Sequence, residues 1–283
     1  MKLVLTFILL SCSTPLKKTT QAAILQNLSN PESVYFDPTT GLTFISNVDG
    51  EGNAKDGKGY ISTLSFIDER LVTKEWLTGL NAPKGMRAQN GNLWVSDIDR
   101  VLVIDISTAK IIKEVQVPGA QFLNDIAITP DGTVYVSDTI GSSIYKIIDY
   151  KSIIFMKGDD LESPNGLLFQ SGKLYVASWG LTTDWSTKVL GRLYSINIQE
   201  KKISYITKKP LGNLDGLEIT GSGNFLVSDW VAGKIYKITQ SGETELLLKT
   251  QKGSADIGFI PKKKLVIIPS MLQSKILTLK VSD

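Results

Sequence analysis

The feature that most constrains the fold is a sequence unit that occurs six times between residues 28 and 283. Each unit opens with a small polar cluster, passes through a turn rich in Gly, Asn or Pro, and then continues as an aliphatic run. The opening residues are Glu32, Lys84, Asn124, Asn165, Asp215 and Asp256, which are 52, 40, 41, 50 and 41 residues apart. A period near 40 residues accommodates four short strands, which is one blade of a β-propeller.

The repeats predict an all-β, six-bladed β-propeller over residues 28–283. Hairpin signals such as Pro130–Gly132 separate the short apolar runs, and no stretch shows a helical hydrophobic period over 12 or more residues. The last repeat shows only three strands. We therefore expect an N-terminal strand within 22–28 to pair with the last blade and close the ring, which removes an open sheet edge.

Two repeats are longer than the others because they carry insertions, near residues 51–59 and 181–190. Each insertion follows the second strand of its blade, so both are expected on the face where the repeats open. We expect ligands to bind at that face. The first insertion is similar to a phosphate-binding loop, but a strand follows it at 60–66 where such a loop needs a helix N-terminus. We therefore predict no nucleotide site.

The N-terminal residues have the pattern of an export signal. Lys2 precedes the apolar run 3–10, which is too short for a membrane-spanning helix but suits a signal peptide. Cys12, the only cysteine, follows it in a context similar to a bacterial lipobox. The alternative is an ordinary signal peptide with an incidental cysteine.

From this pattern we expect residues 1–11 to be a signal peptide and Cys12 to be lipidated. Residues 12–27 would then be a tether that merges into the closing strand. The protein would be exported and anchored by lipid to the bacterial cell envelope, on the periplasmic side in a Gram-negative cell.

Charge and composition exclude several kinds of partner. The net charge is +3 and the lysines are scattered, whereas a nucleic-acid binder gathers its basic residues in a stripe. The chain has no histidine, which excludes a histidine general base and histidine-ligated zinc within this chain. We expect a monomer that acts on a small-molecule substrate.

The opening residues are expected to meet at the mouth of the central channel, since each begins a blade. Among them, the carboxylates of Glu32 and Asp215 and the amides of Asn124 and Asn165 form an all-oxygen set. Such a set suits a hard divalent cation, most of all calcium. Asp256 is a further carboxylate from the sixth blade. The alternative is that these polar residues only cap the blade starts, as Asn and Asp do in many turns.

Four short motifs extend this pattern: Pro31-Glu32, Asn124-Asp125, Pro164–Leu167 and Asp215-Gly216. Over residues 28–283 they resemble the senescence-marker-protein, gluconolactonase and luciferin-regenerating-enzyme family, with more distant similarity to diisopropylfluorophosphatase and the paraoxonases. The resemblance implies that Glu32, Asn124, Asn165 and Asp215 surround a divalent cation. It also implies a hydrolase that acts on a lactone or a related ester.

Within that hypothesis, Asp215 is a metal ligand and candidate nucleophile, and Asp125 is a candidate base. Lys84 binds an anionic group of the substrate or is simply a surface lysine. Two departures from the family favour a different function. Phe122 stands where sugar lactonases carry arginine, and the channel histidines of paraoxonases are missing.

The alternative function is a non-catalytic propeller. In this hypothesis Trp179, Trp185 and Trp230 form an aromatic rim that binds a sugar or a protein partner. The substrate-binding residues predicted for either function are Lys84, Trp179 and Trp230.

Overall fold

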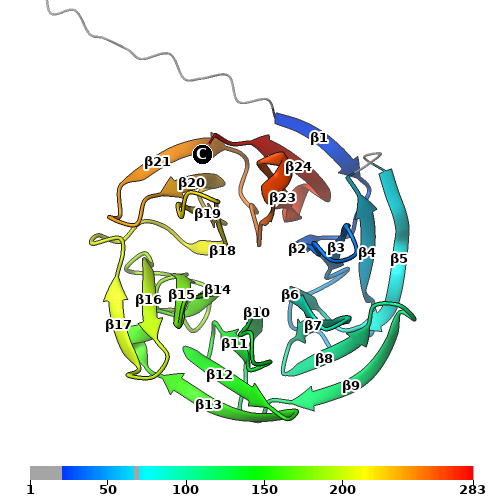
Figure 1. The fold of residues 1–283 in the computed structure, drawn as a ribbon, viewed down its shortest axis with the longest axis horizontal. Helices are drawn as coiled ribbons and strands as arrows, with labels where there is room; N and C mark the ends of the chain where they lie inside the picture. Colours follow the sequence, from blue (N-terminus) through cyan, green and yellow to red (C-terminus); the bar gives the residue numbers. More distant parts are fainter. Residues whose placement is uncertain (1–20, 67–69, 283) are drawn as a thin grey trace, which may run out of the picture.

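The computed structural model describes residues 21–66 and 70–282. They form six four-stranded antiparallel sheets arranged as a ring around a central channel (Figure 1). The prediction of a six-bladed propeller is therefore confirmed. No helix in the described part of the chain is long and apolar enough to cross a membrane. Cys12 and the predicted signal peptide lie outside these residues, so export and lipidation stay predictions.

The innermost strand of each blade lines the channel (Figure 1). These strands are β2 (Pro31–Phe36), β6 (Pro83–Gln89), β10 (Leu123–Ile128), β14 (Pro164–Gln170), β18 (Leu214–Ile219) and β22 (Gly258–Ile260). The second strands are β3 (Leu42–Asn47), β7 (Asn92–Asp97), β11 (Val134–Asp138), β15 (Lys173–Ser178), β19 (Phe225–Asp229) and β23 (Leu265–Ser270). We number the blades 1 to 6 in this order.

The third strands are β4 (Gly59–Ser65), β8 (Arg100–Asp105), β12 (Ser143–Ile148), β16 (Leu193–Asn197), β20 (Lys234–Ile238) and β24 (Lys275–Lys280). The outermost strands are β5 (Arg70–Leu80), β9 (Lys110–Gln116), β13 (Lys151–Lys157), β17 (Lys202–Tyr205), β21 (Thr244–Lys249) and β1 (Gln21–Gln26). Three short 3₁₀ turns complete the elements: η1 (Asp159–Leu161), η2 (Pro261–Lys263) and η3 (Met271–Gln273).

The ring is closed by the N-terminal strand, as expected. β1 pairs antiparallel with β24, from Gln21 opposite Leu279 to Gln26 opposite Lys275. Blade 6 therefore combines the first strand with the last three. This pairing satisfies the edge of β24 that would otherwise be open.

The core lies between the blades. Each large apolar cluster combines residues of two adjacent sheets, because the two faces of every blade are covered by its neighbours. At the junction of the last and first blades, Val34 and Ile45 pack with Ile267 and Ile276. Burial of these aliphatic side chains on both faces of the second strands explains the unbroken apolar runs in the sequence.

Candidate functional site

A bulge at the start of each innermost strand positions the opening residues. In five blades the pairing of the first two strands changes register at that point, which bends the strand and re-aims a side chain. The shifts lie between Pro31 and Val34, Pro83 and Met86, Leu123 and Ile126, Pro164 and Gly166, and Leu214 and Leu217. The opening residues lie at these irregular positions, where they can turn toward the channel.

Glycines next to the opening residues let the blades approach closely. A Cβ atom at Gly166 would overlap the backbone oxygen of Asp215, and one at Gly85 would overlap the backbone and carboxylate of Asp125. Neighbouring innermost strands therefore touch backbone to backbone at this level. That contact explains why side chains from separate blades can reach one another.

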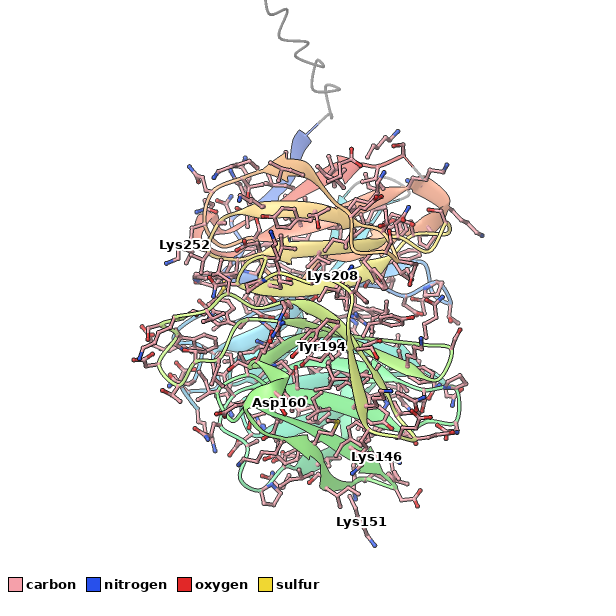
Figure 2. All side chains as sticks on the ribbon, turned by 90° about the vertical axis from the view of Figure 1, so that its left-hand side faces the viewer. Lys146, Lys151, Asp160, Tyr194, Lys208 and Lys252 are labelled. Atoms are coloured by element: carbon pink, nitrogen blue, oxygen red, sulfur yellow. The ribbon has the colours of Figure 1, made fainter. Side chains whose placement is uncertain are left out.

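A cavity of about 510 Å³ opens at the mouth of the channel. It is lined by five of the six opening residues, namely Glu32, Lys84, Asn124, Asn165 and Asp215. The predicted substrate-binding residues Trp179 and Trp230 line it as well. Both insertions contribute, through Glu51–Asn53 and Trp185, so they lie on the face where the repeats open. Lys252, another lining residue, projects from the left-hand face of the disc in Figure 2, which places the mouth on that face.

The four predicted metal ligands share an unusual property. Each has one buried side-chain oxygen with no hydrogen-bond partner among the described residues: Glu32 Oε2, Asn124 Oδ1, Asn165 Oδ1 and Asp215 Oδ1. Thr43 Oγ1, Asn47 Oδ1 and Asp256 Oδ1 share this property, but their residues do not line the cavity. A buried polar atom without a partner costs free energy, so native structures rarely leave several together. These four atoms come from four different blades but belong to residues that line the same cavity.

The orientation of Asn124 is fixed by its neighbour. Thr139 Oγ1 donates its hydrogen to the carbonyl of Pro164 at 3.0 Å, so it can only accept from the amide of Asn124, at 3.3 Å. Asn124 Nδ2 therefore faces Thr139, which leaves Oδ1 as the free oxygen.

The carboxyl groups have raised pKa values. Burial raises the pKa of Glu32 to about 8, opposed by the charge of Lys84 and reinforced by Asp125. The pKa of Asp215 lies well above its usual range because of burial, then of the negative charges of Glu32 and Asp125. Burial is the largest cause for both groups, and neighbouring negative charges add to it.

This donor set fits a hard divalent cation. Two carboxylates and two amide oxygens are the ligands that calcium takes, with water completing the coordination. In the described part of the chain no group of three or more His, Cys, Asp or Glu side chains is close enough to hold a metal ion. The site proposed here has only two carboxylates, because its other two donors are the amide oxygens of asparagines.

Lys84 is a buried part of the cavity wall. Its ammonium donates to the carbonyls of Gly52 and Ala82, at 2.9 Å each, and lies 4.1 Å from the centre of the Phe122 ring. Burial lowers the pKa of Lys84 to about 8, against the opposing charges of Glu32 and Asp97. It is therefore not a surface lysine, and its hydrogen bonds hold the first insertion against the mouth.

Asp125 and Asp256 lie outside the cavity lining. Asp125 accepts backbone hydrogen bonds from Ile126 at 2.6 Å and Leu167 at 2.7 Å, which ties blade 3 to blade 4. Asp256 accepts a hydrogen bond from the Ser33 hydroxyl at 2.5 Å. A catalytic base was predicted at Asp125, but both of its oxygens are engaged in holding the strands together, and it does not line the cavity.

The sequence interpretation missed an arginine in the channel. Arg87 lies 3.4 Å from Glu218 and 3.8 Å from Asp125, and its guanidinium contacts the Tyr35 ring. These charges raise the pKa of Arg87, although burial opposes them. A signal was present: Tyr35, Arg87 and Glu218 each follow an opening residue by three positions. Across a bulge, that spacing returns a side chain to the channel.

Comparisons with known proteins identify the fold. No protein-family model matches the sequence, and no curated protein matches it significantly. Among solved structures, a gluconolactonase from Xanthomonas campestris has a TM-score of 0.70 at 13% identity, over 94% of this chain and 91% of that one. The calcium-binding protein regucalcin from Agrobacterium tumefaciens has a TM-score of 0.66 at 14% identity, over 93% and 94%.

A virginiamycin B lyase from Staphylococcus aureus has a TM-score of 0.65 at 15% identity, over 94% of this chain and 99% of that one. At these identities the comparisons establish the fold alone. The likeness to gluconolactonases that the sequence motifs indicated is confirmed at that level. The chain therefore shares its six-bladed propeller fold with a gluconolactonase, a regucalcin and a virginiamycin B lyase.

Proposed function

We propose that the protein is a divalent-cation-dependent hydrolase of a lactone or a related ester, with calcium as the preferred cation. One observation carries this proposal: each of the four residues expected to be metal ligands has a buried oxygen without a partner, and all four residues line one cavity. A capping role would leave these oxygens bonded to backbone N–H groups. Their free state is explained by a positive ion that they share.

The proposed mechanism assigns each residue a separate task. Glu32 and Asp215 would hold the cation through their carboxylates, and the amide oxygens of Asn124 and Asn165 would complete the protein's share of the site. A bound divalent cation polarises a carbonyl oxygen and lowers the pKa of water. Asp215 lines the cavity, so its carboxylate is placed to take a proton from the attacking water or to act as nucleophile.

The test begins with calcium binding to protein treated with a chelator. Calorimetry is expected to find one bound calcium ion, and calcium should raise the melting temperature. At a hundredfold excess over the dissociation constant the gain is about 2.7 kcal/mol. Asp215→Ala and Glu32→Ala should weaken binding more than Asn165→Ala and Asn124→Ala, because charge dominates affinity at oxygen sites.

Glu51→Ala is the matched control, since this acidic residue lines the same cavity without a buried unpaired oxygen. It should retain calcium binding. A panel of lactones and esters should then show hydrolysis that the chelator abolishes. Absence of a bound ion and of any calcium-dependent shift in the wild type would overturn the proposal.

A second candidate is the non-catalytic binding propeller. The observation that favours it is a continuous set of aromatic rings in the cavity wall. Binding of a ligand with no turnover, in protein that has been shown to hold calcium, would select this function.

A further inference from the structure

The aromatic side of the cavity has a specific construction. Phe122, Trp185, Trp179 and Trp230 form a chain of rings that we call the aromatic wall. Phe122 and Trp185 meet edge to face at 4.7 Å, Trp185 and Trp179 at 5.2 Å, and Trp179 and Trp230 are tilted at 5.9 Å. The rings come from three loops, so only the folded ring of blades assembles them.

Trp185 shows that the wall is held open toward the cavity. It lies in the second insertion with φ of 68°, a left-handed conformation that a bulky side chain rarely adopts. The residue is nevertheless 40% exposed, although its ring contacts Phe122 and Trp179. Trp185 lines the cavity, so its exposed surface is available to a ligand that enters there.

The other residues near the wall are both charged and apolar: the ammonium groups of Lys84 and Lys252 lie 4.1 and 5.1 Å from the centres of the Phe122 and Trp230 rings. Val48, Val231 and Met271 line the cavity together with the wall. A hydroxyl group that packs against the faces of these rings would lose its bonds to water without regaining them from the rings. The buried Nε1–H of Trp179 has no acceptor among the described residues, so the wall offers one polar point that an oxygen atom would satisfy.

The same cavity thus has two unlike sides. One carries the free oxygens of Glu32, Asn124, Asn165 and Asp215, and the other carries the aromatic wall. We infer that the substrate is a lactone or ester that bears an aromatic or other flat apolar ring, rather than a polyhydroxylated sugar lactone. This inference rests on the proposed hydrolase, and the ring of the substrate packs against the wall while its carbonyl faces the four oxygens.

Binding of lactams, which resist hydrolysis, tests the inference apart from activity. The probes are 3,4-dihydro-2-quinolinone, δ-valerolactam, which lacks the fused benzene ring, and δ-gluconolactam, which carries hydroxyl groups. Titration calorimetry with saturating calcium should show the quinolinone binding at least about tenfold more tightly than either of the others. Trp185→Ala should reduce this preference to about twofold or less.

Val189→Ala is the control variant, because Val189 lies in the same insertion, is 63% exposed and does not line the cavity. It should keep the full preference. An unchanged melting temperature for Trp185→Ala shows that its loss of preference is local. Equal affinity for the three lactams, tighter binding of the gluconolactam, or a preference that survives in Trp185→Ala would overturn the inference.

The two proposals fail in different ways. Wild-type protein that binds calcium but shows no preference for the quinolinone would leave the hydrolase in place and remove the substrate class. A repeat titration in chelator covers the opposite case. A preference that depends on Trp185, in protein that binds no calcium, would support the aromatic wall as the ligand site and remove the hydrolase.

Discussion

At the scale of single residues, the channel combines acidic groups that burial has made unusually weak acids. Burial raises the pKa of Glu218 from 4.5 to about 7, in spite of the nearby guanidinium of Arg87. Its folded state therefore binds a proton more tightly than its unfolded state. The side chain is 17% exposed, so solvent moderates this effect only in part. Glu218 destabilises the fold once it must ionise.

The pH dependence follows from this shift. Below about pH 4.5 Glu218 is protonated in both states and adds no penalty. As the pH rises from about 4.5 to about 7 the penalty grows to about 3 kcal/mol and then stays constant. The glutamine in Glu218→Gln does not ionise. The free energy of unfolding of this variant, relative to that of the wild type, should therefore increase between about pH 4.5 and pH 7. Urea unfolding of both proteins at pH 4.5 and 7.5 measures the gain, and an unchanged difference between them would contradict the assignment.

At the scale of elements, close packing between innermost strands means that a change in one blade displaces a proposed metal-ligand residue in the next blade. Gly166 of β14 has no room for a Cβ atom, because the backbone of Asp215 in β18 occupies that place. Its φ is not positive, so the constraint is close packing and not backbone conformation.

We therefore expect Gly166→Ala to push β18 away and displace Asp215. Overpacking of this kind costs about 1–3 kcal/mol, which a melting curve will detect. Calcium affinity should fall as well, since a ligand moves. Gly172→Ala, in the hairpin of the same blade with nothing near its Cβ position but a positive φ, is the control for general loss of stability. A loss of calcium affinity in that variant equal to the loss in Gly166→Ala would refute the explanation.

The elements also show what the sequence could predict. Repeats of about 40 residues determine four strands per blade, and the opening positions identified Glu32, Asn124, Asn165 and Asp215 before any contact was known. Contacts between side chains across the channel were harder to predict from the sequence. The pairing of Arg87 with Glu218 depends on the bulges in β6 and β18, and a bulge changes which residues face the channel without changing the hydrophobic pattern.

The aromatic wall illustrates the same limit. Phe122 was recognised only as a departure from the sugar lactonases, and Lys252 was not recognised at all. Both lie in loops, where no periodic pattern assigns a direction to the side chain. Asp125 was a candidate base in the hydrolase hypothesis, and the sequence did not indicate that its two oxygens accept the backbone N–H groups of Ile126 and Leu167.

At the scale of the whole molecule, the proposed cell-envelope location depends on Cys12 alone. Metabolic labelling with a palmitate analogue should mark the wild type and leave Cys12→Ser unlabelled, because acylation needs the thiol. Fractionation should then find the wild type with membranes and the variant released from them. Equal labelling of the two proteins would contradict lipidation at Cys12.

The closing of the ring by β1 has a consequence for the order in which the protein is made. Residues 21–26 leave the ribosome early, but their partner β24 spans residues 275–280 at the other end of the sequence. The strand must wait, unpaired, until almost the whole chain has been synthesised. Contacts between such distant segments form slowly. β1 is thus among the last strands to find its place. Until then the edges of the incomplete ring are open to association with other unfinished chains.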